Sequence, residues 1–110
     1  MHSVQVFDQE GNFIVQWEQF GRPSGLFIDA NDMLYVTDSS SENSGPAGSS
    51  RNNSLYAEGL RVANVKDGFI TLFIEDPYEN GSQEGVVVDN AGNIYGSLTA
   101  GMALRKYILK

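Results

Sequence analysis

One stretch of sequence occurs twice in this chain, and this repetition constrains the possible folds more than any other feature. The first copy, residues 22–38, reads RPSGLFIDANDMLYVTD, and the second, residues 85–97, reads GVVVDNAGNIYGS. At a constant offset of 60 residues the aligned pairs include Gly25 and Gly85, Ile28 and Val88, Asp29 and Asp89, and Tyr35 and Tyr95. Internal repetition is the signature of architectures in which each copy builds one unit of supersecondary structure. The sequence therefore predicts a repeat protein.

The rest of the chain consists of short apolar or alternating segments bounded by Gly, Pro, Asn and Asp, a pattern typical of strands joined by tight turns. No segment has the periodicity of a helix. Strands are expected at residues 4–7, 13–17, 25–29, 33–38, 59–65, 69–74, 85–89, 94–98 and 103–109. The segment 25–29 is a continuous apolar run, which predicts a strand buried on both faces.

The grouping of these strands predicts the blades of a β-propeller. They form groups of two, four and three, and four antiparallel strands followed by a Gly- and Pro-containing connection make one blade. We therefore expect an all-β chain of about two to two and a half antiparallel blades over residues 1–110. Residues 1–17 would end one blade, 25–74 would form a complete blade, and 85–110 would form an incomplete last blade. Residues 39–58, rich in Ser, Asn and Gly, would be an inserted exposed loop.

Composition narrows the classes of partner. The formal net charge of −7 argues against binding to nucleic acid or to an anionic membrane surface. The absence of cysteine excludes disulfides and thiol chemistry in this chain. The first residues lack the basic and apolar regions of a signal peptide, so the sequence leaves the localisation open.

The repeated stretch, with VQVFDQEGNF before it, resembles the NHL repeat of six-bladed β-propellers. The segments GLRVANVKDGFITLFIEDP and EGVVVDNAGNIYG are similar to the C-terminal part of bacterial peptidyl-α-hydroxyglycine α-amidating lyase-like proteins. The resemblance covers nearly the whole chain outside residues 40–57. It implies a six-bladed propeller completed by further blades or by self-assembly, and it is compatible with an extracytoplasmic location.

The resemblance also implies where a metal would lie. The lyase family binds its metal through histidines in a P-H-G sequence where an inner strand begins. Ser24 stands at that position in the first copy and Glu84 in the second, while His2 is the only histidine and lies at the N-terminus. We therefore expect no metal site and no catalytic residue in this chain, with zinc or calcium bound only in a complete propeller. Asp29 and Asp89 could be calcium ligands, but their spacing favours turn-forming residues that bond nearby backbone amides.

Six residues are the candidates for ligand binding, because the loops that would carry them emerge on one face of a propeller. They are Arg22, Ser24, Asp38, Arg51, Tyr56 and Glu84. The alternative for Arg22 and Glu84 is a structural pair across adjacent blades. A set of aromatic residues is expected to pack between blades instead of binding a ligand, namely Trp17, Tyr35, Phe69, Phe73 and Tyr95.

These observations favour a scaffold or a ligand- or protein-binding module that is not catalytic on its own. The alternative is a part of a metal-dependent amidating lyase-like or lactonase-like enzyme, completed by further blades or by oligomerisation. Related repeats also bind protein or RNA, and the acidic balance of this chain argues against RNA.

Overall fold

The structure is a computed structural model, and it describes residues 3–38, 59–75, 83–98 and 103–108. All regular structure within these ranges is β-strand, which confirms the prediction of an all-β fold. The strands are β1 (Val4–Phe7), β2 (Phe13–Trp17), β3 (Pro23–Ile28), β4 (Met33–Asp38), β5 (Gly59–Asn64), β6 (Ile70–Glu75), β7 (Gln83–Val88), β8 (Ile94–Leu98) and β9 (Ala103–Tyr107).

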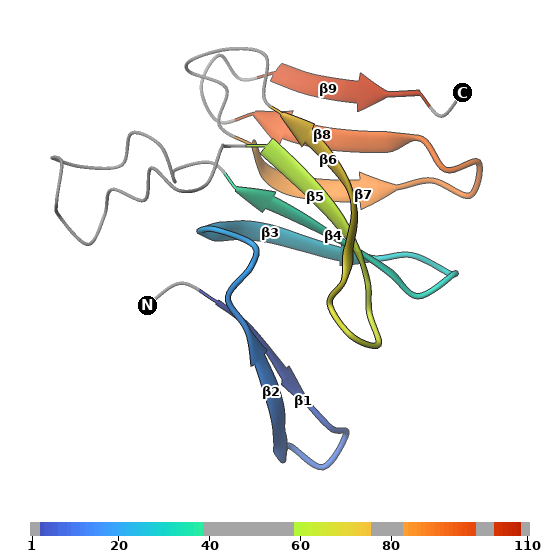
Figure 1. The fold of residues 1–110 in the computed structure, drawn as a ribbon. Coiled ribbons are helices and arrows are strands. Elements are labelled where there is room, and N and C mark those ends of the chain that lie inside the picture. Colours follow the sequence, from blue (N-terminus) through green and yellow to red (C-terminus); the bar gives the residue numbers. More distant parts are fainter. Residues whose placement is uncertain (1–2, 39–58, 76–82, 99–102, 109–110) are drawn as a thin grey trace, which may run out of the picture.

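The strands form three antiparallel sheets (Figure 1). We call β1-β2 the N-terminal sheet, β3-β4-β5-β6 the middle sheet and β7-β8-β9 the C-terminal sheet. The predicted grouping of two, four and three strands is therefore confirmed, whereas the closed propeller and the number of blades stay predictions. β3 and β7 begin two residues earlier than expected, because Pro23 pairs with Asp38 and Gln83 pairs with Leu98 across a register shift.

Asp29 organises the turn between β3 and β4. Its Oδ1 accepts hydrogen bonds from the backbone amides of Asn31 at 2.8 Å and Met33 at 3.0 Å. Asp89 makes the same two bonds, to Ala91 and Asn93, in the turn between β7 and β8. The interpretation of both aspartates as turn-forming residues is confirmed. A carboxylate that satisfies its own turn in this way makes the hairpin a locally specified unit.

The middle sheet lies between the other two, and its side chains alternate between them. Leu34, Val36 and Ala63 pack with Val4, Trp17 and Phe20 against the N-terminal sheet. On the opposite face, a second cluster joins the middle sheet to the C-terminal sheet and comprises Tyr35, Leu60, Val62, Val86 and Ile94. Because successive side chains of a strand point to opposite faces, β4 and β5 contribute to both cores.

The expectation that β3 is buried on both faces is wrong. Leu26 is 54% exposed and Ile28 is 53% exposed, although Phe27 between them packs against the C-terminal sheet. The N-terminal sheet consists of β1 and β2, and its core contacts are to residues of β4, to Ala63 of β5 and to Ile70 of β6. One face of β3 is therefore left open.

The aromatic residues that were expected to pack between blades differ in their exposure. Trp17 and Tyr35 are each 8% exposed and pack between sheets, as predicted. The prediction is wrong for Phe69, which is 69% exposed in the turn before β6. The prediction is also wrong for Phe73, which is 39% exposed and belongs to neither core. Phe73 pairs with Arg61 across β5 and β6, and the Cζ atom of Arg61 lies 4.6 Å from the centroid of the Phe73 ring. No helix in the described ranges is long and apolar enough to cross a membrane.

Candidate functional site

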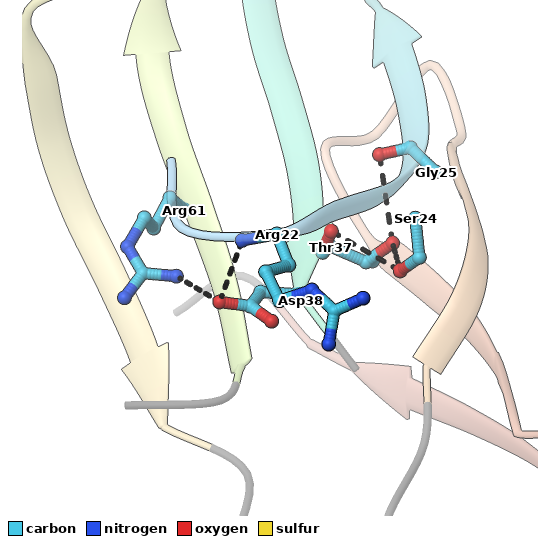
Figure 2. A network of polar contacts seen from close by, with 6 residues as sticks. All are labelled: Arg22, Ser24, Gly25, Thr37, Asp38 and Arg61. Carbon is cyan, nitrogen blue, oxygen red and sulfur yellow. Dashed lines mark hydrogen bonds and ion pairs between the residues drawn. The ribbon is translucent and has the colours of Figure 1, made fainter. Parts of the chain in front are cut away.

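Three of the predicted rim residues lie together where β3 begins and β4 ends. Pairing of Pro23 with Asp38 brings Arg22 and Ser24 beside the end of β4, as Figure 2 shows. With Thr37 and Arg61 they form what we call the rim cluster. Of the other three candidates, Glu84 lies in β7, whereas Arg51 and Tyr56 fall outside the described residues, as does His2.

Asp38 is the centre of the rim cluster. Its side chain is buried, and its Oδ2 accepts a hydrogen bond from the backbone amide of Arg22 at 3.3 Å. The same oxygen lies 3.5 Å from Nη1 of Arg61, which is buried too. The guanidinium group of Arg61 is held between this carboxylate and the ring of Phe73. A buried charge of either sign needs such compensation, so the pair holds β4 and β5 together at this end of the sheet.

Sequence reasoning did not single out Arg61. It pairs with Val36 across β4 and β5, and its place beside Asp38 depends on a register set across residues 39–58. One signal in the sequence could have marked it. An arginine in the middle of the apolar segment GLRVA is a buried-charge candidate, and such a residue usually has a partner.

The hydroxyl of Ser24 is engaged within its own hairpin. It donates to the carbonyl of Thr37 at 3.2 Å and lies 3.0 Å from Oγ1 of Thr37. Thr37 is fully buried, and its Oγ1 in turn donates to the carbonyl of Gly25 at 3.5 Å. These contacts join β3, the edge strand of the middle sheet, to β4, so both hydroxyls have a structural role.

Glu84 reaches this region through its backbone. A Cβ atom added to Gly25 would collide with the carbonyl oxygen of Glu84 and would lie 3.0 Å from the Cα atom of Gly85. β3 and β7 therefore approach each other backbone to backbone, and the two aligned glycines of the repeat face each other there. Pairing of the Arg22 side chain with Glu84 stays a prediction.

Away from the rim cluster, Tyr35 of β4 forms a partly buried pair with Asp29 of the turn between β3 and β4. The hydroxyl of Tyr35 donates to Oδ2 of Asp29 at 2.8 Å. Burial and this bond raise the pKa of Tyr35 to about 12. Burial alone would raise the pKa of Asp29, but bonds from Met33, Tyr35 and Asn31 outweigh it and lower that pKa.

The second copy of the repeat has the same pair. The hydroxyl of Tyr95 donates to Oδ2 of Asp89 at 3.1 Å. The backbone amide and side chain of Asn93 contribute most to lowering the pKa of Asp89. Both carboxylates are thus occupied by donors of their own hairpins. Within the described ranges, no group of three His, Cys, Asp or Glu side chains is placed to hold a metal ion.

An apolar cleft lies between the N-terminal sheet and the open face of β3, and it was not predicted. Its volume is about 530 Å³. The lining residues come from four strands and one turn, and they are Val4, Gln5, Val6, Phe7, Trp17, Leu26, Phe27, Ile28, Leu34 and Val65. In the part of the chain that the structure describes, β1 pairs only with β2, so its other edge borders this cleft with unpaired backbone groups.

The cleft and the rim cluster thus offer different chemistry. In the rim cluster Thr37, Asp38 and Arg61 are buried, and the charges of Asp38 and Arg61 face each other at 3.5 Å. The cleft offers exposed apolar side chains beside a free strand edge, which is the chemistry that recognises an extended chain. Comparison with protein-family models, with curated proteins and with solved structures found no match to this chain.

Proposed function

We propose that this chain is a propeller-type scaffold of NHL-like blades, and that it binds protein by accepting a strand hairpin in the cleft beside β1. The three sheets would be successive blades, with the middle sheet as the complete one. Main-chain hydrogen bonds to the free edge of β1 would supply affinity. Pockets for alternate side chains would supply specificity, as in other cases of strand addition.

The exposure of Leu26 and Ile28 carries this proposal. Two neighbouring large apolar residues on one face of a strand, more than half exposed, stand next to an unpaired edge. An arriving hairpin would cover both side chains and would pair with β1, so one event would satisfy the apolar face and the backbone. Exposed apolar patches beside such an edge mark interaction sites or aggregation sites.

The rim cluster supports the scaffold part of the proposal. Its buried carboxylate and guanidinium group lie 3.5 Å apart, and its two hydroxyls each donate to a backbone carbonyl of the paired strand across the β3–β4 hairpin. A site of this kind stiffens the end of the middle sheet without exposing a nucleophile or a base. We therefore place recognition at the cleft and not at the rim.

The test uses a peptide of residues 22–38, which form the β3–β4 hairpin. In the middle sheet this hairpin pairs with β5, and the incoming hairpin would pair with β1 in the same way. Trp17 is the only tryptophan of the chain, it lines the cleft, and the peptide contains none. We expect saturable quenching or a shift of Trp17 emission on titration. An unchanged emission, together with no binding by calorimetry, would overturn the proposed function.

The control compares two equally exposed positions. Leu26→Asp places a charge in the cleft and should abolish the titration. Ile14→Asp changes a residue of β2 that is 59% exposed and does not line the cleft, so it should leave the titration unchanged. Equal loss in both variants would mean that the peptide binds elsewhere.

A further inference from the structure

We infer that the hairpin accepted by the cleft belongs to a second copy of this chain. In this arrangement the β7–β8 hairpin of one copy enters beside β1 of the next, and β1 takes the place that β9 holds in a single chain. The inference rests on the proposed function, and it names the partner of the cleft. The internal repeat provides the argument, because it shows how such a hairpin packs.

The receiving surface has a filled counterpart within the molecule. At the offset of 60 residues, Leu26 aligns with Val86 and Ile28 with Val88. Val86 is 6% exposed, and both valines pack in the core shared with the middle sheet. Their partners there include Phe27 of β3 and Tyr35 of β4. Leu26 and Ile28 are thus the same repeat positions without a β3–β4 hairpin opposite them.

The donating surface carries the residues that are missing opposite Leu26 and Ile28. On β7–β8, Val87 aligns with Phe27 and Tyr95 with Tyr35. The two hairpins have the same register, since Val87 pairs with Tyr95 as Phe27 pairs with Tyr35. Val87 points away from the core and is 54% exposed. The outer face of β7–β8 therefore carries the residue positions that cover a β3 face, and among the described residues of one chain it covers no such face.

The strand that pairs with β8 determines how the two copies would join. In the middle sheet β5 pairs with β4 of the first hairpin, and in the C-terminal sheet β9 pairs with β8 in the same way. In β5, Leu60 is fully buried and Val62 is 6% exposed, whereas Leu104 of β9 is 68% exposed. β1 already packs Val4 against the middle sheet, at 7% exposure. If β1 replaced β9 beside β8, a strand that buries Val4 in the core would take the place of one whose Leu104 is exposed.

Such an interface joins two different surfaces, so it is heterologous and propagates until a ring closes or a filament grows. Each chain has a formal net charge of −7, which opposes association. Salt screens this repulsion and strengthens burial of the apolar faces. We therefore expect self-association that increases with protein concentration and with salt.

The experiment is light scattering on the full chain across a dilution series. We expect a mass above that of one chain at high concentration, falling on dilution. Leu26→Asp should give a monomer at every concentration, and Ile14→Asp should associate like the unchanged chain. A monomer throughout, for the unchanged chain, would overturn the inference. Binding of the 22–38 peptide to that monomer would leave the proposed function standing.

A second variant tests the exchange of strands. Ser97 and Leu104 are direct partners on β8 and β9, and both side chains are exposed. Cysteines at both positions would lock β9 onto β8, because directly opposed residues lie within the reach of a disulfide. The chain has no other cysteine. We expect the oxidised double variant to be monomeric and its reduced form to associate, and equal association of the two forms would overturn the exchange.

Discussion

Leu26 and Val86 occupy equivalent positions of the repeat, yet Leu26 is 54% exposed and Val86 is 6% exposed. Truncation should therefore have unequal effects. We expect Val86→Ala to lower the free energy of unfolding by about 1–3 kcal/mol through lost burial and a cavity. Leu26→Ala should change it by less than about 0.5 kcal/mol, as is usual at exposed positions. Urea denaturation below the concentration of self-association measures both, and equal losses would contradict the difference in burial.

The difference between these two residues also shows what the sequence could predict. Turn residues and alternating apolar positions are local signals, so the strands and their grouping followed from them. The tasks of Asp29 and Asp89 were local too, because each bonds within its own hairpin. The exposure of Leu26 was not predictable in this way, since it depends on which strands stand opposite β3 in the neighbouring sheet.

The same limit applies to the candidate site. Arg22, Ser24 and Asp38 were predicted together, because the loops expected to carry them emerge on one face of a propeller, and the pairing of β3 with β4 does bring them together. Arg61 was missed, since residues 39–58 separate it in sequence from the carboxylate it meets. The cleft was missed for a different reason. It belongs to no motif, and only the packing of two sheets of unequal width creates it.

Gly25 sits where the backbones of β3 and β7 meet. A methyl group at this position would collide with the Glu84 carbonyl and would lie 2.9 Å from Oγ1 of Thr37. We expect Gly25→Ala to destabilise the fold by about 1–3 kcal/mol, as overpacking does in other cores. Gly25 is not among the glycines with positive φ, so without the collision alanine would stabilise by restricting the unfolded chain. A rise in the thermal midpoint would thus contradict the close approach of the two sheets.

The hydroxyl of Tyr35 donates a hydrogen bond to Asp29, and Tyr35 itself is 8% exposed. Tyr35→Phe should lower the free energy of unfolding by about 1.5–3 kcal/mol, the usual range for a hydrogen bond to a charged group. Tyr95→Phe is the matched variant at the equivalent repeat position. Its bond to Asp89 is longer, at 3.1 Å, and Tyr95 is only half-buried, so its loss should be smaller. Denaturant unfolding of both variants provides the comparison.

The pH dependence of stability follows from the same pair. Hydrogen bonds lower the pKa of Asp29 below its ordinary value of 3.8, so its contribution is complete above pH 3.8. That contribution is lost as the pH falls through the lowered pKa, because the unfolded state binds the proton first. The pKa of Tyr35 is raised from 10.0 to about 12, so its contribution is complete below pH 10.0 and is lost as the pH rises towards 12.

Thermal unfolding across both limits measures these contributions. Tyr35→Phe has no ionisable hydroxyl at this position, so it should show a shallower loss of stability between pH 10.0 and 12. On the acid side, Asp29→Asn should reduce the loss below pH 3.8. A variant that follows the unchanged chain at both limits would show that the pair does not control the pH response.

Asp38 and Arg61 form a buried pair, with 3.5 Å between Oδ2 and Nη1. Asp38→Asn keeps the shape of the side chain and an acceptor for the Arg22 amide, but it leaves the guanidinium charge uncompensated. Removing one partner of a buried pair typically costs about 3–5 kcal/mol, and we expect a loss near the lower end because the separation is long. Arg61→Met retains an apolar chain that can pack on Phe73, so Asp38→Asn combined with Arg61→Met should recover part of the stability. A double-mutant cycle by urea denaturation tests this, and strictly additive losses would mean that the two charges do not stabilise each other.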